Sequence, residues 1–109
     1  MSYYINVILS VPPAFLPAIN AFTYDRGRTA EFTVTLPGEC GTVCLGSYNH
    51  YDWESFVRQV RELPIPLYDR QSVQMWLRGE SDDVYWELAI WTPEELAASR
   101  EAALWNYHF

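Results

Sequence analysis

The chain of 109 residues contains no lysine. Its seven basic side chains are all arginine and stand against fourteen carboxylates, which gives a net charge of −7. Eleven of the carboxylates lie in residues 51–109, so the acidic character belongs to the second half. A chain of this charge repels the phosphate backbone, and we expect it not to bind nucleic acid directly. It attracts basic surfaces, such as the nucleic-acid grooves of other proteins or basic toxins.

Cysteine and glycine are also scarce. The two cysteines, Cys40 and Cys44, are too few for the disulfide framework of a small secreted domain, so we expect a cytoplasmic protein. None of the five glycines stands in a GxGxxG or GxxxxGK[ST] motif, which argues against the familiar nucleotide-binding loops. The apolar residues 5–11 are too few to cross a bilayer and run into two prolines, so we expect no membrane partner.

Residues with catalytic or metal-binding chemistry do not form a known constellation. Cys40 and Cys44 could supply one pair of zinc ligands, but the second pair would have to combine the two histidines or include an acid. Ser47, His50 and Asp52 are the residue types of a hydrolase triad, yet they share one short loop, whereas triads assemble from separate segments. We therefore expect no enzyme, no metal and no cofactor.

The composition is typical of one globular domain covering residues 1–109, since half of the residues are hydrophobic and 19% are charged. β-branched and aromatic residues over 3–11 predict a strand covered on both faces. Pro13 and Pro17 allow only a short or distorted helix over 13–22, and residues 25–27 are expected to turn.

The clearest strand signal is the alternation over residues 29–36. One face holds four hydrophobic residues, which predicts a half-exposed strand with that face toward the core: Ala30, Phe32, Val34 and Leu36. Residues 37–41 form a turn, and residues 42–48 return as the hairpin partner. Residues 72–78 and 84–91 predict a second hairpin around the turn at 79–83.

Two helices have clear start signals. Asp52 is a good N-cap for a helix from Trp53 to about Leu63, which two prolines then end in an extended crossover over 64–69. Thr92-Pro93-Glu94-Glu95 is a capping box for a helix to about residue 105. The order of elements predicts an α+β fold: an antiparallel or mixed sheet of about five strands, with two main helices on one face.

Aromatic residues suggest where a partner would bind. The chain has five Trp, eight Tyr and five Phe, and rings and arginine dominate interface hot spots, where lysine is depleted. The loop at 46–53 mixes rings and polar groups as antibody paratopes do. On the second hairpin, Trp76, Arg78, Tyr85, Glu87 and Trp91 fall opposite the expected core face, beside the acids of its turn. Rings placed outward indicate a second covering layer, a dimer interface or a partner site. The ten residues that we predict to contact a partner are Tyr48, His50, Tyr51, Trp76, Glu80, Asp82, Asp83, Tyr85, Glu87 and Trp91.

These patterns predict a protein that works by binding. We expect a small acidic inhibitor that occludes a basic surface of a target protein. The same patterns also allow a homodimer. In size, acidity and lack of a catalytic motif the chain resembles phage-encoded anti-defence inhibitors, anti-CRISPR proteins among them; the likeness is one of composition and includes no motif. An immunity protein that neutralises a basic toxin has the same physical description. A module that stacks its rings on a small ligand or a carbohydrate is the other alternative.

Overall fold

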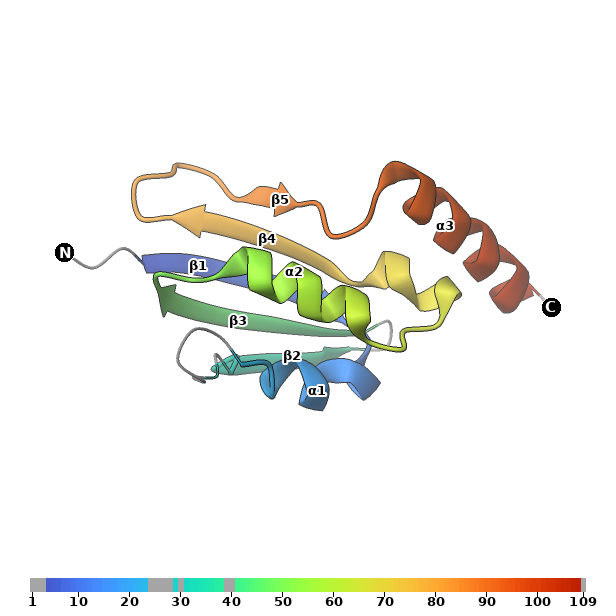
Figure 1. Cartoon of the computed structure of the whole chain (residues 1–109), viewed down its shortest axis with the longest axis horizontal. Coiled ribbons are helices and arrows are strands. Elements are labelled where there is room, and N and C mark those ends of the chain that lie inside the picture. The colour runs from blue at the N-terminus through green and yellow to red at the C-terminus, as the bar shows by residue number, and fades with distance from the viewer. Residues whose placement is uncertain (1–3, 24–28, 30, 39–40, 109) are drawn as a thin grey trace.

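The computed structural model describes residues 4–23, 29, 31–38 and 41–108, so the expected turn at 25–27 lies outside the described residues, as do Ala30 and Cys40. Five strands form one antiparallel sheet in the order β2-β3-β1-β4-β5 (Figure 1). The strands are β1 (Tyr4–Val11), β2 (Val34–Gly38), β3 (Gly41–Asn49), β4 (Gln74–Gly79) and β5 (Trp86–Leu88). The helices are η1 (Pro13–Phe15), α1 (Leu16–Asn20), α2 (Trp53–Glu62), η3 (Leu67–Ser72) and α3 (Pro93–His108). The predicted α+β fold is confirmed.

β1 is the central strand, paired with β3 on one side and with β4 on the other. Val7, Leu9 and Val11 lie on its inner face and are almost fully buried. The prediction that both faces of this strand are covered is wrong, because Ile8 and the other residues between them are only half-buried. Ile8 is shielded by its cross-strand neighbours, Trp76 among them, and not by a second layer.

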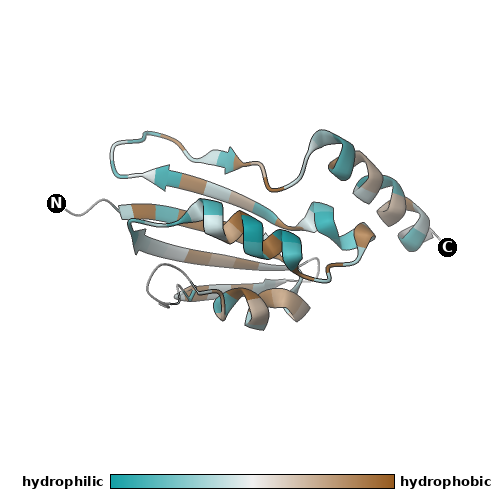
Figure 2. Cartoon of the chain, viewed as in Figure 1, coloured by the Kyte–Doolittle hydropathy of each residue, from teal (hydrophilic) through white to brown (hydrophobic). Residues whose placement is uncertain are grey.

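α2 covers the inner face, as its sequence predicts. The Asp52 carboxylate accepts a hydrogen bond from the Ser55 backbone N–H at 3.0 Å, so it caps the first turn. Phe56 and Val60 have no exposed surface, and hydrophobic and hydrophilic bands alternate along the helix (Figure 2). Pro64 follows directly after the C-terminal turn, which is where a helix has to end. Hydrophobic burial against the sheet therefore places α2.

β2 differs from its prediction. The strand begins only at Val34, since the chain bends at Thr33, whose backbone N–H donates to the Leu45 carbonyl. Phe32 precedes the bend and is buried on the inner side. Val34 and Leu36 follow it and are 45% and 54% exposed. The expected single apolar face is thus split by the bend, and two of its members face away from the core.

The second hairpin forms, but its return strand is short. β5 has three residues, and the expected strand over 84–91 is wrong at both ends. The alternation predicts Val84, Trp86, Leu88 and Ile90 on the core face; Leu88 and Ile90 are buried, whereas Val84 and Trp86 are 71% and 43% exposed. The Ile90 carbonyl accepts from the Arg61 guanidinium at 2.8 Å, so this carbonyl bonds to α2 and not to a neighbouring strand.

α3 is joined to the domain through η3. The segment after Pro66, expected to be extended, forms this 3-10 helix, which packs against α3. Ser99 is fully buried; its hydroxyl donates to the Leu67 carbonyl at 2.6 Å and accepts from the Gln71 backbone N–H at 2.9 Å. Two backbone groups of η3, four residues apart in the chain, are therefore satisfied by one side chain of α3.

The capping box of α3 also forms, and it is extended by an arginine from α2. Thr92 and Glu95 exchange hydrogen bonds of 3.2 and 2.9 Å. The Arg61 guanidinium donates to both Glu95 carboxylate oxygens at 2.9 Å. The Arg61 guanidinium, with help from the Thr92 backbone N–H, lowers the pKa of Glu95 to about 2. This group joins α2 to the start of α3.

Ser99→Ala should destabilise the protein by about 1–3 kcal/mol, because the Gln71 N–H and the Leu67 carbonyl both lose the partner that the buried Ser99 hydroxyl gives them. Urea unfolding followed by Trp fluorescence measures the change. Ser47→Ala, at an exposed site on β3, is the matched control and should change stability by less than about 0.5 kcal/mol. An equal loss in the two variants would contradict the role given to Ser99.

Glu95→Gln should lower the melting temperature at pH 7. The difference in melting temperature between this variant and the wild type should narrow as the pH falls from 4.5 toward 2. A carboxylate whose pKa is lower in the folded chain stabilises it above the unfolded pKa and loses that effect as it is protonated. Glu94→Gln, one residue earlier in the same helical turn, is the control. A gap that stays constant down to pH 2, measured by circular dichroism, would show that the Arg61–Glu95 pair does not act in this way.

Candidate functional site

The described elements leave one face of the sheet uncovered. α1 and α2 lie over the inner face, and no element in the described part of the chain covers the opposite one, which we call the open face (Figure 1). Residues opposite each other in an antiparallel ladder share a face, and alternation with the buried Val7 and Leu9 assigns Ile8 to the open one. One row of paired residues crosses all five strands: Glu87, Trp76, Ile8, Leu45 and Val34.

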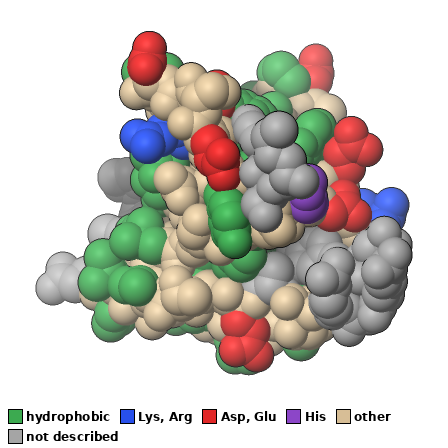
Figure 3. Space-filling view, turned by 90° about the vertical axis from the view of Figure 1, so that its left-hand side faces the viewer, with side chains coloured by type: hydrophobic (Ala, Val, Ile, Leu, Met, Phe, Trp, Pro, Cys, Tyr) green, Lys and Arg blue, Asp and Glu red, His purple; other side chains and the backbone are tan. Residues whose placement is uncertain are grey.

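Two shorter rows flank this one. Toward the end of β1 the row is Gln74, Ser10, Val43 and Leu36. Toward the start of β1 it is Arg78, Asn6 and Ser47. The hydrophobic members nearest the β2 edge are the most exposed, with Leu36 at 54% and Val43 at 37%. Figure 3 views the molecule from the end that holds the β4–β5 turn, and hydrophobic side chains gather along the left of that view, on the side of the sheet away from α2.

The acids at the β4–β5 turn divide into two kinds. Glu80 accepts from the Tyr4 backbone N–H at 2.8 Å, and Asp82 accepts from the Gly79 backbone N–H at 2.7 Å. Both carboxylates therefore help to fix the turn. Asp83 is exposed beside them. The predicted acidic tip is present, and two of its three carboxylates hold the turn.

Arg78 and Tyr85 form a pair at the same end of the sheet. The Arg78 guanidinium carbon lies 5.7 Å from the centre of the Tyr85 ring, within the range of a cation–π contact. Arg78 shares the open face with Asn6 and Ser47. Of the residues predicted on the outward face of this hairpin, Trp76, Arg78 and Glu87 are placed there by the strand pairing.

The other predicted loop lies on the opposite side. Tyr48 and Tyr51 stack with ring centres 4.8 Å apart, and Tyr48 also packs edge-on against Phe32. Tyr51 is only 8% exposed and belongs to the core, while the Tyr48 hydroxyl donates to the Glu31 carbonyl at 3.0 Å. His50 is exposed, with a backbone φ of +52° that is unusual for a non-glycine residue. The structure therefore does not bring this loop together with Trp76.

Trp91 was expected to face outward with Trp76, and this is wrong. It is 8% exposed, and the guanidinium carbons of Arg61 and Arg70 lie 5.4 and 6.0 Å from its ring centre. β5 ends at Leu88, so the two-residue alternation cannot be extended to position 91. Within the described chain the buried Trp91 Nε1 has no hydrogen-bond partner.

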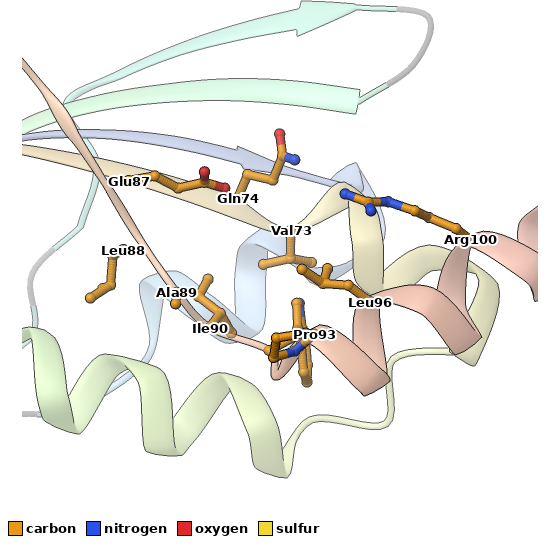
Figure 4. Close-up of a pocket in the computed structure, with 10 residues that line it drawn as sticks. Val73, Gln74, Glu87, Leu88, Ala89, Ile90, Pro93, Leu96 and Arg100 are labelled. Atoms are coloured by element: carbon orange, nitrogen blue, oxygen red, sulfur yellow. The ribbon is translucent and has the colours of Figure 1, made fainter.

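A pocket of about 330 Å³ opens between β4, the β5–α3 connection and α3. Trp91 and Glu87 line it, together with residues that the sequence analysis missed, among them Gln74 and Arg100. Figure 4 shows Gln74, Glu87 and Arg100 along one side of the pocket, across from hydrophobic side chains such as Leu96. Sequence spacing could not reveal this pocket, because its walls come from three separate segments.

Among the described residues, those with possible catalytic or metal-binding chemistry do not converge. Cys44 is a free thiol buried on the inner face, and burial raises its pKa. Ser47 is on the open face, and Asp52 is engaged as a helix cap. In the part of the chain that the structure describes, no three His, Cys, Asp or Glu side chains gather as a metal site needs. None of the helices described there has the length and the apolar composition that a membrane-spanning helix requires.

Comparison with known proteins gives no relative for this chain. No protein-family model matches it, and neither does any curated protein or any solved structure.

Proposed function

We propose that the protein binds another protein through the open face, and that it acts as an inhibitor by covering a functional surface of that target. One observation supports this above all: a row of paired residues with four hydrophobic members, from Trp76 through Ile8 and Leu45 to Val34, crosses the sheet, and no described element lies over it. Soluble monomers seldom leave such a patch uncovered unless it serves an interaction.

The size of the face fits one side of a specific interface. Five strands about 4.8 Å apart give a width of about 19 Å, and the nine residues of β3 extend over about 30 Å. Because β2 and β5 have only five and three residues, the face covers less than the product of these lengths, about 500 Å², against the ~800 Å² that each partner contributes to a standard interface. The β4–β5 turn and its rings enlarge the contact at one end.

The chemistry of the face indicates the kind of partner. Trp76 is a suitable anchor, because large rings near the centre of an interface contribute much of its binding energy. Carboxylates lie at the rim, with Glu87 at the end of the row and Asp83 at the turn. These features match a target with an apolar centre and basic residues around it. A second copy of the chain fits less well, since two chains with a net charge of −7 repel each other.

The two inhibitor hypotheses use the same surface. An inhibitor of a nucleic-acid-binding protein and an immunity protein against a basic toxin both need an acidic rim around a hydrophobic centre. The compositional likeness to anti-CRISPR proteins adds no contact residue to either. The identity of the target, and not the surface, separates the two.

Leu36→Asp should weaken the complex at least tenfold, because it places a charge in a hydrophobic contact. The target is first captured on the wild-type chain and identified by mass spectrometry; its affinity for each purified variant is then measured by calorimetry. Leu104→Asp is the matched control, as Leu104 is 57% exposed on α3, away from the sheet. Unchanged binding by Leu36→Asp, or an equal loss with Leu104→Asp, would contradict the proposal. A dimer in light scattering that Leu36→Asp dissolves would make the occupant a second copy instead.

Asp83→Asn should slow association with the target about threefold at low salt and leave dissociation nearly unchanged, since rim charges act mainly on the encounter of the two proteins. Asp83 suits this test better than Glu80 or Asp82, whose carboxylates hold the turn. Surface plasmon resonance at low and high salt measures the effect, which should vanish at high salt. Glu101→Gln on α3 is the control; equal slowing by both variants would point to net charge and not to a local rim.

A further inference from the structure

The pocket beside α3 has features that protein binding through the open face does not explain. Its volume of about 330 Å³ lies within the range of small-molecule sites, about 300–1,000 Å³. Most of its lining is hydrophobic, with Val73, Leu96 and Pro93 among the side chains drawn in Figure 4. Such a lining receives the apolar part of a ligand.

Two side chains of opposite charge line the same pocket. Glu87 comes from β5 and Arg100 from α3, and Figure 4 shows both on the side where Gln74 also lies. Among the described residues neither Glu87 nor Arg100 takes part in an ion pair; the acid–base pair found there is Arg61–Glu95. A positive and a negative group that share a rim without neutralising each other can each bind the opposite charge of a ligand.

We infer that this pocket binds a small zwitterion with a hydrophobic side chain, of the class of the apolar α-amino acids. The ligand carboxylate pairs with the Arg100 guanidinium, the ammonium group pairs with the Glu87 carboxylate, and the side chain enters the hydrophobic part. Gln74, an amide between the two charges, can donate to the carboxylate or accept from the ammonium group.

Trp91 makes the pocket observable. It lies in the pocket wall, and the guanidinium groups of Arg61 and Arg70 lie against its ring. A ligand that displaces water from this wall changes the surroundings of a nearly buried indole. The total emission of the five tryptophans therefore changes on binding and reports occupancy, with calorimetry as the independent measure.

The test uses phenylalanine and two analogues that each lack one charge: 3-phenylpropanoate has no ammonium group, and 2-phenylethylamine has no carboxylate. Leucine and methionine are titrated in parallel. The wild-type chain should bind at least one of the three amino acids with a Kd below about 1 mM, and phenylalanine at least tenfold more tightly than either analogue. Glu87→Gln should abolish the advantage over 3-phenylpropanoate, and Arg100→Gln the advantage over 2-phenylethylamine.

Matched controls separate this site from the open face. Glu101→Gln and Arg58→Gln remove the same charges elsewhere on α3 and α2 and should leave the affinity unchanged. Leu36→Asp, at the far edge of the sheet, should also leave it unchanged, so the two proposals can fail separately. The inference is overturned if none of the three amino acids binds, if the analogues bind as tightly as phenylalanine, or if the control variants weaken binding as much as Glu87→Gln and Arg100→Gln do.

Discussion

The burial of one face of β1 beneath α2 is the contact on which the rest of the structure depends. β1 pairs with both β3 and β4, so the side chains that it turns toward Phe56 and Val60 fix which face of all five strands is the inner one. A one-residue shift of this pairing would turn every hydrophobic residue of the strand to the other side. α2 occupies the inner face, α3 packs on η3, and no described element covers the second face.

The sequence predicted the helices and strands better than it predicted which of their residues are buried. Local signals identified both helix caps, since the Asp52 cap and the Thr92–Glu95 box depend only on residues three apart. Alternation also identified the hairpins. It failed where the alternation was interrupted, at the bend of Thr33 and after Leu88. Leu36 was therefore expected in the core but is exposed, and Trp91 was expected to face outward but is buried. Burial is decided by the layer that packs on a strand, and that layer comes from residues distant in the sequence.

The open face and the pocket share part of their surface, which links the two proposals physically. Gln74 and Glu87 belong to rows of the open face and also line the pocket. A ligand ammonium group that pairs with Glu87 would remove one negative charge from the rim that a basic target meets. Ligand and target would then compete for the same carboxylate, and by thermodynamic linkage each would weaken the binding of the other. A ligand bound mainly through Arg100 would have no such effect.

The absence of lysine becomes understandable through what the arginines do. Arg61 and Arg70 both lie against the ring of Trp91, and Arg78 lies over Tyr85. Arg61 at the same time donates to both oxygens of Glu95 and to the carbonyl of Ile90. A lysine ammonium is a compact, strongly hydrated charge, whereas a planar guanidinium can stack on a ring and still donate along its edge. At Arg61 the substitution of lysine would lose the paired hydrogen bonds while it kept the charge. Three of the five arginines that the structure describes, Arg61, Arg70 and Arg78, thus act through the shape of the guanidinium group as well as through its charge.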